Sequence, residues 1–229
     1  LEGRLDVSDN GKFIAPRGNL ELNSHLTVDL TADFQHNQGT VVIDGTVELF
    51  PLDYASANAP ITFYNITHTS GTLYIERPIV VENTYLKTGG NAIHYSKATF
   101  GTETSAGTLT INSGEWQMYP YYNNAYLYGA SELFPVVIDG SGIVNWSHAN
   151  NHEVYTKWID YQNDAELEGR CSAGGHSTKG ACEGAGETWS YTVLIIDGTS
   201  YFQDIEANGG YLDFNGQQVT VDHISTNNF

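Results

Sequence analysis

Short segments rich in Val, Ile, Thr, Tyr and Phe recur along the whole chain, and each is bounded by Gly, Asn, Asp or Ser. Residues 39–50, 61–69 and 107–119 are typical examples. Short runs of β-forming residues between turn-forming residues are the pattern of β-strands. The best helical candidate, residues 160–169, is short and has few apolar residues at helical spacing. The sequence therefore predicts an all-β chain whose turns draw on its 24 glycines.

A pentapeptide recurs three times at unequal intervals, as VVIDG at residues 41–45 and 136–140 and as LIIDG at 194–198. It is read here as a strand followed by a turn. Because successive residues of a strand point to opposite faces, we expect an inward-facing apolar residue in each copy. The residues expected to point inward are Val42, Ile138 and Ile195.

The Asp-Gly pair that ends each copy favours a corner of the chain. Asp bonds to nearby backbone groups and Gly accepts positive φ, so both suit a sharp turn. The predicted corner residues are Asp44, Gly45, Asp139, Gly140, Asp197 and Gly198. Calcium ligation or carboxylate catalysis is the alternative, but a calcium loop needs several closely spaced oxygen ligands, which these segments do not offer.

Two all-β architectures fit these observations: a β-sandwich or jelly roll with long hairpins, and a solenoid of short strands stacked coil upon coil. Residues 18–115 resemble the repeats of right-handed parallel β-helix surface proteins of bacteria and phages. The segments that carry the resemblance are FQHNQGTVVIDGTVEL, ITFYNITHTSGTLYI, IVVENTYLKTGG and GTLTINSG. The resemblance implies a right-handed parallel β-helix, or β-solenoid, with irregular coils. A β-sandwich or jelly roll remains the alternative.

The cysteines divide the expected solenoid. Residues 1–170 are interpreted as solenoid repeats, 171–189 as a Cys-bounded loop insertion, and 190–229 as a continuation of the solenoid in a fragment of a longer chain. The insertion resembles a short insert of marine phage and bacterial structural proteins. Cys171 and Cys182 are expected to form a disulfide that closes this loop. Two free thiols, or a metal site that includes His176, are the alternatives.

An aromatic cluster stands out within residues 115–134, among Asn and Gln residues. Such rings suit a packed core or a subunit interface, and they also suit stacking on the faces of sugars. The candidate residues for glycan or subunit contact are Trp116, Tyr119, Tyr121, Tyr122, Tyr126 and Tyr128.

The charge of the chain limits the kinds of molecule that it can bind. The sequence has 9 Lys and Arg residues and 27 Asp and Glu residues, for a formal net charge of -18. A polyanion of this kind repels phosphate backbones and anionic lipid surfaces, so nucleic acid is not an expected partner. No stretch approaches the roughly 18 uninterrupted apolar residues of a membrane helix, so membrane insertion is not expected either. No metal or cofactor motif is recognisable. The carboxylate pairs Asp160/Asp164 and Glu166/Glu168 could cleave a glycosidic bond only if they faced a groove.

The resemblance to phage and bacterial surface proteins implies a non-enzymatic structural protein of a phage virion, either a fibre or a capsid decoration protein, exposed at the surface and contacting receptors or host glycans. A bacterial cell-surface adhesin or filament module is the first alternative, and a polysaccharide-degrading β-helix enzyme is the second. Open solenoid ends favour assembly, so a homo-oligomer is expected alongside other virion or cell-surface proteins. By analogy with phage fibres this oligomer is a trimer, with Tyr121, Tyr122 or Tyr126 at a subunit contact.

Overall fold

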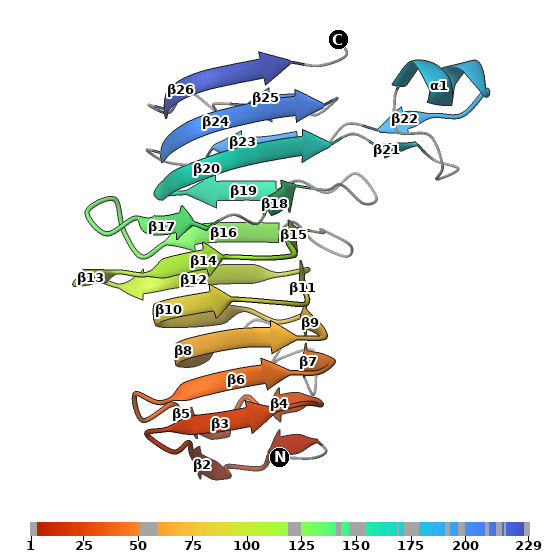
Figure 1. Cartoon of the computed structure of the whole chain (residues 1–229). Helices are drawn as coiled ribbons and strands as arrows, with labels where there is room; N and C mark the ends of the chain where they lie inside the picture. The colour runs from red at the N-terminus through yellow and green to blue at the C-terminus, as the bar shows by residue number, and fades with distance from the viewer. Residues whose placement is uncertain are drawn as a thin grey trace.

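The computed structural model shows a β-solenoid whose strands stack from the N-terminus at one end to the C-terminus at the other (Figure 1). In each coil the chain passes through three stacks of parallel strands. Residues paired on adjacent coils are between 18 positions apart, as for Ile61 and Ile79, and 41 positions apart, as for Asp160 and Tyr201. The residues described are 4–50, 59–118, 125–140, 143–146, 154–168, 170–171, 179–190, 193–196, 200–208, 211–213, 217 and 219–226.

The first stack is built by parallel pairing of short strands, and the ends of three long strands complete it. Its members are β1 (Leu5–Val7), β4 (Leu26–Val28), β7 (Val47–Phe50), β9 (Thr72–Ile75), β11 (Asn91–His94), β15 (Glu115–Met118), β18 (Ile143–Trp146) and the second halves of β20 (Ile159–Glu168), β24 (Ser200–Asn208) and β26 (Val219–Thr226).

The second stack follows each strand of the first. Its members are β2 (Lys12–Ile14), β5 (Asp33–Gln35), the first halves of β8 (Ile61–Ser70) and β10 (Ile79–Lys87), then β12 (Lys97–Thr102), β16 (Ala125–Gly129), β19 (Val154–Lys157), β23 (Val193–Ile196) and β25 (Tyr211–Asp213).

The third stack closes each coil. Its members are β3 (Asn19–Leu22), β6 (Thr40–Asp44), the second halves of β8 and β10, β14 (Thr108–Ile111), β17 (Val136–Asp139) and the first halves of β20, β24 and β26. The parallel stacks confirm the predicted all-β solenoid, and the sandwich or jelly-roll alternative is wrong because those folds pair their strands antiparallel.

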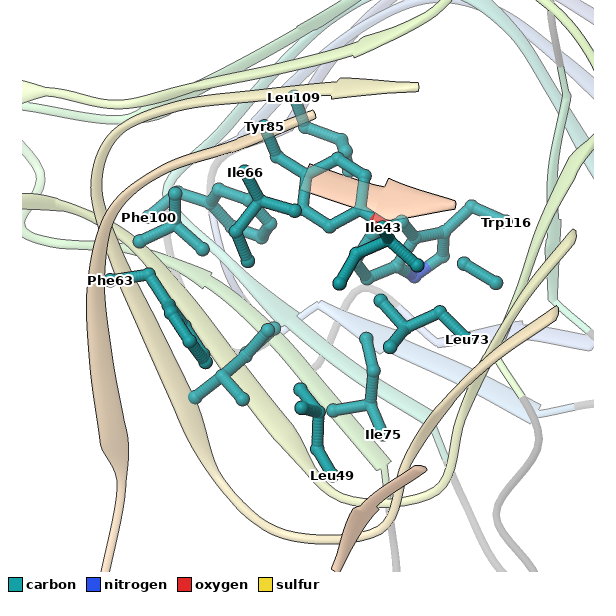
Figure 2. Packing of buried hydrophobic residues seen from close by; sticks show 14 of the residues in the cluster. Ile43, Leu49, Phe63, Ile66, Leu73, Ile75, Tyr85, Phe100, Leu109 and Trp116 are labelled. Atoms are coloured by element: carbon teal, nitrogen blue, oxygen red, sulfur yellow. The ribbon is translucent and has the colours of Figure 1, made fainter. Parts of the chain in front are cut away.

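Strand alternation fills the interior with apolar side chains. Along β8, β10 and β14 buried residues alternate with half-exposed ones. Figure 2 shows the side chains from the three stacks meeting inside the coil, with large aromatic groups among the aliphatic ones. Phe63, Tyr85, Phe100 and Trp116 are each at most 1% exposed. Burial of such side chains supplies most of the driving force for folding.

The pentapeptide shows both a correct and a wrong prediction of side-chain direction. Ile138 is buried as predicted, with 1% exposure. Val42 is half-exposed, whereas Val41 and Ile43 on either side of it are buried, so the prediction for Val42 is wrong. Val42 and Ile138 occupy different places in the pentapeptide, and a shift of one residue along a strand reverses the face. The side chain of Ile195 lies outside the described set.

Two short hairpins leave the stacks. β12 turns back into β13 (Ser105–Ala106), and β21 (Arg170–Cys171) pairs antiparallel with β22 (Trp189–Ser190). A helix, α1 (Lys179–Gly184), contacts β21 and β22 to the side of the solenoid (Figure 1). After this excursion β23 pairs with β19 and β24 with β20. Residues 160–169, the best helical candidate, belong almost entirely to strand β20 instead.

Candidate functional site

The Asp-Gly pairs of the first two copies stand where the third stack turns into the first. Asp44 ends β6 and Gly45 follows with φ of 140°. The Asp44 carboxylate accepts hydrogen bonds from Ser70 Oγ at 2.6 Å and Thr69 Oγ1 at 3.3 Å, on the next coil. Asp139 likewise ends β17, and Gly140 has φ of 105°. The hydrogen bonds of Asp44 therefore give this carboxylate a structural role at the turn.

The third copy lies in a different place. Its strand, β23, belongs to the second stack, because it pairs with β19 and β25. Asp197 and Gly198 lie outside the described residues. The pentapeptide therefore marks a local strand sequence that the solenoid uses in two different stacks, and it does not mark one repeated position.

A column of glycines with positive φ, Gly45, Gly71, Gly90, Gly114 and Gly140, runs along this edge and is called the glycine corner. A Cβ atom on Gly90 would lie 2.2 Å from the Gly71 oxygen, and one on Gly114 would lie 2.2 Å from the Gly90 oxygen. At Gly71, Gly90, Gly114 and Gly140 the backbones of neighbouring coils therefore approach too closely for a side chain, and the positive φ also requires glycine. At Gly45 the nearest atom would be 3.2 Å away, so the positive φ is the main reason for glycine.

Two buried titratable side chains, Lys87 and His68, bond to backbone carbonyl oxygens of the glycine corner from the interior of the solenoid. Lys87 Nζ donates to the carbonyl oxygens of Gly90 and Ser113, the latter at 2.6 Å. His68 Nε2 lies 3.0 Å from the oxygen of Ser70, and its Nδ1 lies 3.2 Å from the Tyr85 hydroxyl. Burial lowers the pKa of His68 to about 4 and that of Lys87 to about 8. Because these groups bond to the backbone of the corner, their role is structural.

His94 is a third buried polar residue, with an exposure of 0%. Its ring packs edge-on against Trp116 at 5.7 Å between ring centroids. Neither of its ring nitrogens has an aligned hydrogen-bond partner within the described part of the chain. Burial lowers its pKa to about 3, and the nearby backbone of Ser96 opposes this only in part. His94 is therefore neutral in the folded protein near pH 7.

Trp116 lies in the interior of the solenoid and is not a surface residue, contrary to the prediction from the sequence. It is 0% exposed and packs edge-on against Tyr85, with 4.9 Å between ring centroids. Its Nε1 donates to Met118 Sδ at 3.2 Å. A side chain inside the coil cannot reach a glycan or another subunit, so that assignment is wrong for Trp116. The alternation of Trp116 and Met118 along β15 was the signal for burial.

Tyr126 and Tyr128 do lie on the outside. They alternate with buried residues along β16, and their rings meet edge-on at 5.7 Å between centroids. Lys97 Nζ lies over the Tyr128 ring, 5.2 Å from its centroid. These three residues are called the tyrosine–lysine patch. Tyr119, Tyr121 and Tyr122 lie outside the described residues.

A second outward-facing pair of aromatic rings was missed in the sequence. Tyr74 on β9 and Tyr95, which follows β11, have parallel rings whose centroids are 6.5 Å apart. Glu48 and Glu76 lie beside them, and the four residues are called the carboxylate–tyrosine patch. They come from three successive coils, so only the coil register could have brought them together.

The remaining candidates give no site. Asp160, Asp164, Glu166 and Glu168 lie on β20, and their side chains are outside the described set. In the described part of the chain no group of three or more His, Cys, Asp or Glu side chains could hold a metal ion. Cys182 is buried on α1, which contacts the strand that carries Cys171. The disulfide stays a prediction.

Comparison with known proteins gives no relative: no family model, no curated protein and no solved structure matches this chain. Within the described residues no helix has the length and apolar character needed to cross a membrane.

Proposed function

We propose that the chain is a non-enzymatic structural protein of a phage virion, a fibre or a capsid decoration protein, which presents its outer faces to host-surface glycans. The observation that carries this proposal is the division between inside and outside. The described interior is packed with apolar side chains from all three stacks, whereas paired tyrosines face outward. A stiff rod with aromatic outer faces suits surface display and sugar stacking.

The tyrosine–lysine patch supports a contact role. Tyr126 and Tyr128 are half-buried, so each ring keeps an accessible surface. Lys97 supplies an exposed cation in a chain with net charge -18, and it could pair with an acidic group on a glycan or on another subunit. The expected assembly is a homo-oligomer, a trimer for a fibre, with Tyr126 at or near the subunit contact.

Immunogold electron microscopy of native particles, with antibodies against this chain, tests the location. Labelling along virion fibres or capsids is expected. Label on bacterial cell surfaces without virions would instead favour an adhesin or filament module, which is the alternative that shares this architecture. Release of reducing ends from polysaccharides by the purified chain would contradict the non-enzymatic assignment.

Light scattering tests the assembly. We expect an oligomer of the chain that dissociates in the Tyr126→Ser variant, with unchanged circular dichroism. A stable monomer that loses only its sugar binding in this variant would contradict the assembly proposal and leave a glycan contact in its place.

A further inference from the structure

The carboxylate–tyrosine patch is built by the register of β7, β9 and β11, which lie one above another in the first stack (Figure 1). Glu48 of β7 pairs with Tyr74 of β9. Just after β11, the backbone N–H of Tyr95 donates to the carbonyl oxygen of Ile75 at 3.0 Å. Because Glu76 is the next residue after Ile75, this bond places Tyr95 beside Glu76 of the preceding coil. Two columns, each with a carboxylate next to a tyrosine, therefore run side by side.

The two tyrosine rings stack on each other across adjacent coils, and this stacked pair is called the platform. They are nearly parallel, with an interplanar angle of 6°, and both side chains are half-buried. Rings held by neighbouring strands of a solenoid lose little further freedom when a ligand stacks on them. Aromatic faces of this kind attract both the C–H faces of sugars and cations.

The charge beside the platform is unbalanced. Partial burial raises the pKa of Glu76, and the nearby Glu48 carboxylate raises it further. His25 Nδ1 lies 3.1 Å from Glu48 Oε2 and opposes this only when it is protonated. Arg77, the next residue after Glu76, is 1% exposed and donates inward to the carbonyl oxygens of Val28 and Ala59. A cation from outside would relieve the repulsion between the two carboxylates.

We infer that the carboxylate–tyrosine patch binds the protonated amino sugars of a polysaccharide. The sugar ring packs against the accessible side of the stacked Tyr74–Tyr95 pair, while its ammonium group lies beside the carboxylates of Glu48 and Glu76. This inference rests on the proposed role in glycan contact and names the class of glycan. Tyr64, a half-buried residue of β8 outside the first stack, stacks on His36 and serves as the control ring.

Isothermal titration calorimetry with a short β-linked glucosamine oligomer, and with its fully N-acetylated counterpart, tests the inference. The two probes share the ring and differ in the ammonium charge. We expect the glucosamine oligomer to bind at least roughly tenfold more tightly near neutral pH, and added salt to reduce the difference. Equal affinity for the two probes, or no binding of the glucosamine oligomer, would overturn the inference.

Variants assign the binding to this surface. We expect Glu76→Gln and Tyr74→Ala each to weaken glucosamine binding by roughly tenfold, and Tyr64→Ala to leave it unchanged. Thermal melts of each variant establish that it is folded. A Tyr64→Ala variant that lost binding while Tyr74→Ala kept it would refute the assignment. The immunogold experiment tests the virion role separately from this site. Unlabelled particles, together with intact glucosamine binding, would contradict the virion role and leave the inferred site unchanged.

Discussion

The glycine corner and the two outward-facing tyrosine patches use the same coils in opposite ways. At the corner, backbones of successive coils touch, and the buried side chains of His68 and Lys87 bond to the corner carbonyls. In the patches, half-buried rings keep part of their surface accessible to solvent and stand beside charged groups. A substitution at the corner should therefore change stability, whereas a substitution in a patch should change binding.

The largest effect is expected for Gly90→Val. Gly90 has φ of 65°, and a Cβ there would lie 2.2 Å from the Gly71 oxygen and 2.7 Å from His68 Nε2. We expect a loss of more than about 3 kcal/mol in the free energy of unfolding, measured by urea denaturation. Gly18→Ala is the matched control, because a Cβ there meets nothing within 4 Å. Equal losses in the two variants would show that the corner is not tightly packed.

The insertion carries the next largest expected effect. If Cys171 and Cys182 form a disulfide, its reduction should cost up to roughly 3 kcal/mol in the chain-entropy model. Thiol labelling of the unfolded, unreduced protein should modify neither cysteine. Two reactive thiols would contradict the prediction. Because the β21–β22 hairpin lies outside the stacks, reduction should leave glycan binding unchanged.

Acid should destabilise the interior through its histidines. The pKa of His94 is about 3 and that of His68 about 4 in the folded chain, against 6.5 when exposed. The unfolded chain therefore takes up more protons below about pH 6.5, so stability falls as the pH is lowered from there toward the folded pKa values. We expect each histidine to contribute a loss of ~2 kcal/mol between about pH 6.5 and 4.5.

Urea denaturation of His94→Phe across this range checks the assignment. The variant should lose less stability on acidification than the parent, because one of the two buried titrating groups is gone. Replacement of the half-buried Ile93, the neighbouring outward-facing residue of β11, by Phe is the control and should leave the pH dependence as it was, because Ile93 carries no titratable group. Identical slopes in the parent and the His94 variant would be incompatible with a neutral, buried His94.

The smallest effect on stability is expected in the tyrosine–lysine patch. Tyr126→Ser and Tyr128→Ser remove half-buried rings from the outside of β16, so the double variant should lose about 1 kcal/mol or less in unfolding free energy per ring. Differential scanning calorimetry measures this loss. A cost equal to that of Gly90→Val would mean that these rings hold the fold together, and the contrast between corner and patch would fail.

Much of the fold could be predicted from local sequence, because turn residues and strand alternation act within a few residues. The ends of β6 and β17 fall at Asp44 and Asp139, where the Asp-Gly pairs stand. The predicted inward direction of Val42 was wrong, because the buried residues are its neighbours Val41 and Ile43. Lys87 was not predicted to be buried. It lies on the same face of β10 as Tyr85, and the carbonyl oxygens of Gly90 and Ser113 explain how its ammonium group can be buried there.

The patches could be predicted only in part. Tyr126 and Tyr128 are close in sequence, so their cluster was visible. Tyr74 and Tyr95 belong to successive coils, and the coil length varies because loops and hairpins of different size leave the stacks. With no fixed period, sequence alone could not pair these two rings or set Glu48 and Glu76 beside them.

A two-dimensional NMR titration with the glucosamine oligomer tests the central contrast most directly, because it reports on the corner and the outer face in one experiment. We predict chemical-shift changes confined to outward-facing residues of the first stack, centred on Tyr74, Ile93 and Tyr95. Gly71, Lys87 and Gly90 at the corner should not shift. Changes centred on the glycine corner, or no changes at all, would contradict an account in which the corner is architecture and the outer face binds.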